Sequence, residues 1–118
     1  MTDYDIRQLN LMIAKLNDFE RGNLSLNHLV SSLDGIQNAL QEIDNQWRNA
    51  FLTQWGVLED INAEALERHS KDSPSEQVSL ASRAIRAIRH LVAERMTLPL
   101  HEDAAERYPR SGPNVDKR

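Results

Sequence analysis

Apolar residues recur at steps of three and four along most of the chain, which is the period of one face of an α-helix. The first such segment covers residues 3–21 and is followed by Gly22, at the position of a helix C-terminal cap. A second covers residues 26–43, and Ser25 precedes it with a side chain able to accept hydrogen bonds from its first free amides. Gly35 lies inside this second segment, where a glycine marks a bend or the close approach of a neighbour.

A third segment begins after Asp44, which is a suitable N-cap. Its apolar stripe is formed by Trp47, Phe51, Leu58, Ile61 and Ala65. Trp55 lies at the edge of this stripe, where it serves either as core packing or as an anchor for a partner. Residues 43–46 contain no Gly or Pro, so one continuous helix is an alternative. We expect two separate helices, because a helix of roughly 45 residues is unusual in so small a domain.

The fourth segment has the clearest start signal in the chain. Ser73 is placed as its N-cap, Pro74 occupies its first helical position, and Glu76 completes a capping box. The helix should end near Pro99, since a proline disfavours helical geometry in the residue before it. Its predicted core positions are Val78, Ala81, Ala84, Ile85, Ile88, Leu91, Val92 and Met96.

Four amphipathic segments with short connections predict an all-α fold in a single domain. We expect an antiparallel bundle of about four helices over residues 1–97. From residue 98 onward the sequence has three prolines and one glycine without apolar periodicity, so residues 98–118 are predicted to form a flexible tail.

Composition narrows the class of protein. The chain has 118 residues, of which 40% are hydrophobic and 27% charged, with no cysteine and a formal net charge of −4. The lack of cysteine excludes disulfides, a thiol nucleophile and cysteine-based metal sites. No apolar run reaches the roughly 20 residues of a membrane-spanning helix, and the first residues lack the features of a signal peptide. We therefore expect a cytoplasmic protein that does not bind membranes.

The histidines show no catalytic or metal-binding pattern. They fall in separate segments, and no two have the four-residue spacing of a helical zinc site: His28, His69, His90 and His101. Di-iron Glu-x-x-His pairs, a Gly-rich phosphate loop and a nucleophile elbow are also missing from the sequence. We expect no enzyme activity, metal or cofactor, and a site assembled from scattered acids and histidines is the weaker alternative.

Acidic residues are concentrated in the middle of the chain. Between residues 34 and 67 a single base, Arg48, accompanies seven acids: Asp34, Glu42, Asp44, Glu59, Asp60, Glu64 and Glu67. The last three are expected to project from the third helix opposite its apolar stripe. Such a strip is either a solvated face or a surface that attracts a basic partner. The seven acids and Trp55 are the candidate partner-binding residues.

A basic stretch follows in residues 83–95, with Arg83, Arg86, Arg89 and Arg95 against Glu94. A net acidic chain lacks the broad positive field that nucleic-acid binding uses, so no nucleic-acid ligand is expected. We expect Arg83 and Arg86 to pair with acids of the second or third helix.

The middle of the chain contains a spaced pattern of apolar, tryptophan and acidic positions. Its parts are GNLSL at 22–26, LDGI at 33–36, LQEID at 40–44, Trp47, Phe51 and WGVLEDINA at 55–63. Over roughly residues 5–95 the chain resembles small helical immunity proteins encoded beside bacterial toxins, including the partners of contact-dependent growth inhibition systems.

The resemblance implies a cytoplasmic bacterial protein that binds a cognate toxin domain, often a nuclease, and blocks its active site. It implies no cofactor, no turnover and no small-molecule ligand. The family has no fixed contact residues, so the acidic candidates come from charge alone, because a nuclease site is positive in order to hold phosphates. The alternative is a non-enzymatic helical adaptor or regulatory module that docks on another protein.

Overall fold

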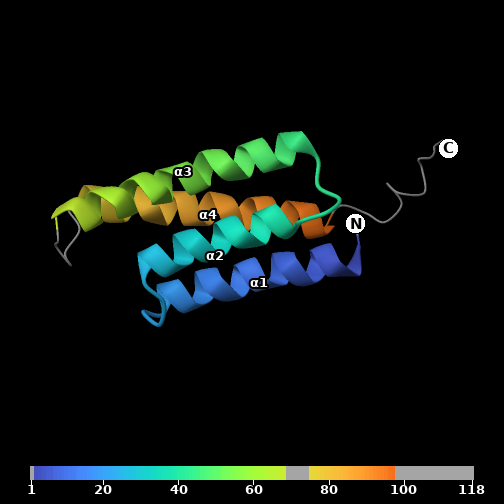
Figure 1. Cartoon of the computed structure of the whole chain (residues 1–118), viewed down its shortest axis with the longest axis horizontal. Helices are drawn as coiled ribbons and strands as arrows, with labels where there is room; N and C mark the ends of the chain where they lie inside the picture. The colour runs from blue at the N-terminus through green and yellow to red at the C-terminus, as the bar shows by residue number, and fades with distance from the viewer. Residues whose placement is uncertain (1, 69–74, 98–118) are drawn as a thin grey trace, which may run out of the picture.

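Four helices make up most of the part of the chain that the computed structural model describes, which is residues 2–68 and 75–97. They are α1 (Asp3–Glu20), α2 (Leu26–Ala39), α3 (Asn45–Arg68) and α4 (Ser75–Thr97), and no strand occurs within these ranges (Figure 1). The predicted all-α bundle is confirmed. The predicted Ser73–Pro74 helix start and the predicted tail at 98–118 lie outside the described residues.

The helices form a closed antiparallel bundle. Each helix packs against the next one along the chain, and α1 also packs against α4. Figure 1 shows neighbouring helices running in opposite directions, with α3 and α4 extending past the α1–α2 turn at one end. None of the helices in the described ranges is both long and apolar enough to span a membrane.

The helix ends follow caps that are visible in the sequence. The Ser25 hydroxyl accepts from the His28 amide at 3.1 Å, and an Asp44 carboxylate oxygen accepts from the Trp47 amide at 2.9 Å. Gly22 has a φ of 82°, in the left-handed region that a glycine C-terminal cap requires. These three predicted caps are confirmed.

α2 is shorter than predicted, and Ile43 lies outside it. The helix stops at Ala39, so the second and third helices are separate as expected. The backbone turns extended at Leu40, and the next two amides donate to the carboxylate of Asp5 instead of continuing the helix. Of the two alternatives for Gly35, a bend or the close approach of a neighbour, the close approach is wrong, because a Cβ built there would meet nothing within 4 Å.

One side of each helix contributes to the core. Its fully buried members include Leu9, Met12, Leu16, Leu29, Leu33, Phe51, Leu58, Ile88 and Val92. Trp47 stacks on Phe51 with ring centroids 5.6 Å apart, and its indole N–H donates to the Leu91 carbonyl at 2.9 Å. The predicted core position Val78 is wrong, since this side chain is 53% exposed and lines a pocket beside the α1–α2 turn with Phe19, Glu20 and Leu26.

Candidate protein-binding surface

The structure does not gather the seven candidate acids into one surface. Asp34 belongs to α2, while Glu42 and Asp44 lie in the α2–α3 connection. The other four, which we call the α3 acids, are Glu59, Asp60, Glu64 and Glu67 in the second half of α3. At a rise of 1.5 Å per residue, Asp44 and Asp60 are about 24 Å apart along the helix. Only the α3 acids form a local cluster.

The acids outside α3 have roles in local structure. Asp44 caps α3 through its side chain. Asp34 accepts from the Gln37 side-chain amide at 3.3 Å within α2. Glu42 is exposed, and its backbone N–H donates to Asp5 at 2.7 Å. We call the end of α2, the connection and the start of α3 the α2–α3 corner. These three positions contribute to this corner more directly than to a common binding face.

The α3 acids are all exposed. Within the described ranges, no hydrogen bond or ion pair involves the carboxylates of Glu59, Asp60 or Glu67. Their charges are held on a regular helix and remain in contact with water. This arrangement allows a basic partner to bind without first breaking an internal ion pair at these three positions.

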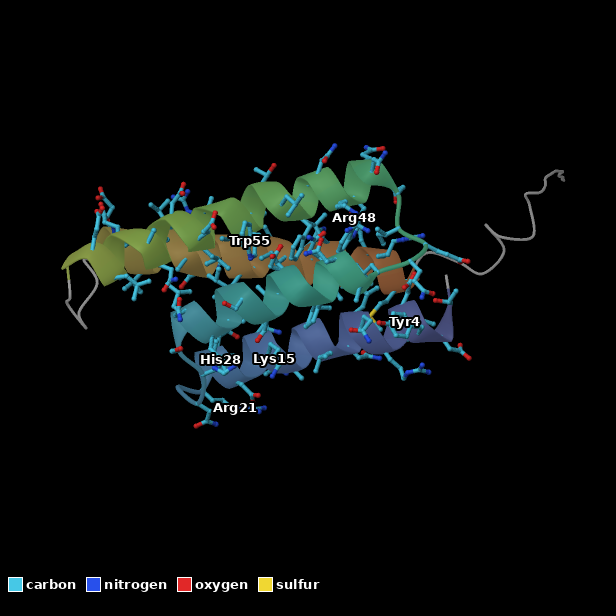
Figure 2. All side chains as sticks on the ribbon, viewed as in Figure 1. Tyr4, Lys15, Arg21, His28, Arg48 and Trp55 are labelled. Carbon is cyan, nitrogen blue, oxygen red and sulfur yellow. The ribbon has the colours of Figure 1, made fainter. Side chains whose placement is uncertain are left out.

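Trp55 has its polar edge inside the protein. Its indole N–H donates to the Val30 carbonyl at 2.9 Å, which ties α3 to α2, and its ring is half-buried (Figure 2). The hydrogen-bonding group of this tryptophan is therefore engaged within the bundle. Only the exposed part of the ring is left for contact with another molecule.

A basic groove runs between α3 and α4 on the side away from α1 and α2. It has a volume of about 640 Å³, and small or polar side chains of α3, including Ala50 and Thr53, line it together with Arg83, Arg86 and His90 of α4. Sequence reasoning gave this groove no role, because its two walls are more than 25 residues apart in the chain and meet only when the helices pack.

The expected pairing of Arg83 and Arg86 with acids of the second or third helix is wrong. Arg83 and Arg86 are exposed and form no ion pair with any residue in the described ranges. Arg89 instead reaches α1, where it pairs with Glu20 and donates to the Asn17 side chain at 2.8 Å. The physical reason is the position of Arg89 on the α1 side of α4, while Arg83 and Arg86 line the outer groove.

The acids and the basic groove share one face of the molecule. Thr53 lines the groove, and Val57, Asp60 and Glu64 follow it at steps of four, three and four, so they continue the same stripe of α3. We call this surface the outer α3–α4 face. It is acidic toward the end of α3 and basic in the groove.

Among the described residues, no group of three or more histidine, aspartate or glutamate side chains is placed to hold a metal ion. No family model matches the chain, and neither a curated protein nor a solved structure with significant similarity was found. The fold and surface define an all-α helical bundle with a strongly charged, exposed face on its α3–α4 side.

Proposed function

We propose that this chain is a bacterial immunity protein that binds a cognate toxin domain in the cytoplasm and neutralises it. In this proposal the toxin domain is a nuclease, and the α3 acids cover its positively charged active site. Two features support the proposal: the resemblance of residues 22–63 to small helical immunity proteins, and the exposure of the α3 acids.

The observation that carries the proposal is that some charged side chains are bonded within the bundle while others are not. Arg48 and Arg89 are bonded within the bundle, whereas Asp60 and Glu67 are exposed and form no bond within the described ranges. A nuclease site must attract phosphates, so it also attracts carboxylates fixed on a rigid helix. Because the helix is already formed, little backbone ordering opposes binding.

The extension of α3 beyond the α1–α2 turn supports a protein partner in particular. Leu66 lies in this extension, seven residues after Glu59 on the same stripe of α3, and is 57% exposed. Protein interfaces commonly combine an apolar contact with a polar rim. Leu66 and Glu59, which share one stripe, offer this combination near the end of the helix.

The test uses the full chain and the toxin domain encoded by the neighbouring gene. Affinity is measured at two salt concentrations for the wild type and for the double variant Asp60→Lys/Glu67→Lys. We expect the double variant to bind about tenfold more weakly or worse and to show a shallower salt dependence. The matched control is Asp3→Lys/Asp18→Lys, which changes the net charge equally on α1 and should bind like the wild type.

Two results would count against the proposal in different ways. Equal affinity and salt dependence for the wild type and the Asp60→Lys/Glu67→Lys variant would exclude the α3 acids as the contact surface. Failure of the wild-type chain to bind the toxin domain or to protect cells from it would exclude the immunity function itself.

A further inference from the structure

The basic groove between α3 and α4 has an apolar floor. Ala50 of α3 and Ala87 and Leu91 of α4 line it, and the two alanines are too short to fill the space between the helices. Leu80 continues the α4 side of this floor, because it precedes Ala87 by seven residues, which is about two helical turns. Leu80 is 41% exposed. The apolar stripe from Leu80 to Leu91 is about 17 Å long and is accessible from outside the bundle.

Two arginines without internal partners stand on the rim of this floor. Arg83 and Arg86, which we call the rim arginines, are exposed and form no hydrogen bond or ion pair with a residue in the described ranges. Like charges three residues apart on a helix repel each other, so this pair disfavours α4. His90 also lines the groove, but its Nε2 lies 3.6 Å from Glu94. Contact with another molecule explains the rim arginines better than folding does.

The helical segments on both sides of the groove contain no acid. α3 has none from residue 45 to 58, and α4 has none from residue 77 to 93. Two further arginines in these segments, Arg48 and Arg89, are bonded within the bundle. The groove is therefore locally positive although the net charge of the chain is −4, and its field attracts carboxylates.

We propose that the basic groove binds an acidic amphipathic helix of a partner protein. The apolar side of this helix packs on Leu80, Ala87 and Leu91, and two of its carboxylates pair with the rim arginines. Arg83 and Arg86 are about 4.5 Å apart along α4, which matches acids three or four residues apart in the partner helix. An apolar groove that receives the apolar face of a helix is a common mode of peptide recognition, and the charged rim adds specificity.

The lining of the groove favours a helix over a nucleic acid. The alanines allow close approach, since the distance between packed helices is set by the side chains at their contact. None of the described residues that line the groove is aromatic, so it has no platform on which bases could stack. Two free arginines also release few counterions, which is the main source of affinity for a nucleic acid.

This inference goes beyond the immunity function and does not depend on it. It concerns an acidic partner at the rim arginines, whereas the immunity proposal concerns a basic partner at the α3 acids. The full chain and a synthetic peptide are enough to test it. A negative result therefore leaves the toxin-binding proposal unaffected.

The first experiment titrates the full chain with an alanine-based helical peptide of about 15 residues. Its leucines recur at steps of three and four, and two glutamates one turn apart flank them. We expect binding at low salt that weakens about tenfold or more with Arg83→Glu/Arg86→Glu. Arg7→Glu/Arg21→Glu is the matched control, because it changes the charge equally at exposed arginines of α1 and its C-terminal cap. This control should bind like the wild type.

The second experiment tests the apolar floor with the same peptide. Leu80→Glu should weaken binding about tenfold, because it places a charge in the apolar contact and repels the glutamates. Leu11→Glu is the control, since Leu11 is also 41% exposed but lies on α1. Circular dichroism checks that the variants remain helical.

The third experiment exchanges the charges. A peptide with lysines in place of its glutamates should bind Arg83→Glu/Arg86→Glu and not the wild type. A scrambled acidic peptide should bind the wild type about tenfold more weakly, because its leucines no longer share one side.

Four results would overturn the proposal. They are a wild type that does not bind the acidic peptide at low salt, equal losses in a groove variant and its control, equal binding of the scrambled peptide, and equal or tighter binding of a single-stranded oligonucleotide at the rim arginines.

Discussion

Asp5 and Asp60 are the same residue type in two helices of one bundle, yet their environments are opposite. Asp5 is 0% exposed, and its two carboxylate oxygens accept from the amides of Gln41 and Glu42 at 2.8 and 2.7 Å. Asp60 is exposed on α3 and accepts no bond from a described residue. The first charge fixes the α2–α3 corner, while the second has no evident part in folding.

The arginines show the same contrast between the two regions. Arg48 donates to the backbone carbonyl and the side-chain oxygen of Gln37, both at 2.7 Å, and to the Leu40 carbonyl at 3.3 Å (Figure 2). It thereby satisfies carbonyls at the end of α2, which have no partner within the helix. Arg83 in the outer groove makes no such contact with the described residues. Charges at the corner hold the fold together, and charges on the outer face remain available for binding.

The largest effect should follow from Asp5→Ala. Hydrogen bonds to a charged group contribute about 1.5–3 kcal/mol each, but Gln41 and Glu42 are exposed and their amides can bind water instead. We therefore expect the free energy of unfolding to fall by about 2 kcal/mol, measured by urea denaturation. Asp3→Ala is the control, since Asp3 is exposed in the same helical turn, and should change stability much less. Equal losses in the two variants would contradict the corner's role.

A smaller loss is expected for Arg48→Lys, which keeps the charge and removes the forked geometry. An ammonium group cannot reproduce the three bonds of the guanidinium, so stability should decrease by about 1 kcal/mol. The paired substitution Arg83→Lys on the outer face should leave the urea midpoint unchanged. If both substitutions have the same effect, the distinction between engaged and free arginines is wrong.

The sequence predicts the parts of this fold that depend on near neighbours. The caps at Ser25 and Asp44 and the left-handed Gly22 involve residues within three positions, so local chemistry is enough to identify them. The early end of α2 depends on Asp5, which lies 36 residues before Gln41 in the sequence. Nothing in the local pattern of α2 indicates that contact.

The binding surface was predictable only in part, for the same reason. The spacing of Asp60, Glu64 and Glu67 identified an exposed acidic stretch of α3 without any knowledge of the fold. Grouping these acids with Glu42 and Asp44 was wrong. Asp60 is only 18 residues after Glu42 in the sequence, but most of those residues belong to α3, so the length of the helix separates the two acids in space. To predict the basic half of the outer α3–α4 face, one needs the register of α3 against α4, and hydrophobic periodicity does not determine that register.

The smallest predicted effect is a gain in stability from Gly56→Ala. Gly56 lies in the middle of α3, between the groove residue Thr53 and Asp60, and a Cβ there would meet nothing within 4 Å. Alanine should therefore raise the free energy of unfolding by about 0.5–1 kcal/mol, because it favours the helix and restricts the unfolded chain. The same substitution at Gly22, where φ is 82°, should lower it by about 1 kcal/mol. Opposite shifts in the urea midpoint would show that the α1–α2 turn requires its glycine while α3 does not. A lower free energy of unfolding for Gly56→Ala would contradict this, because it would mean that α3 also requires a glycine at position 56.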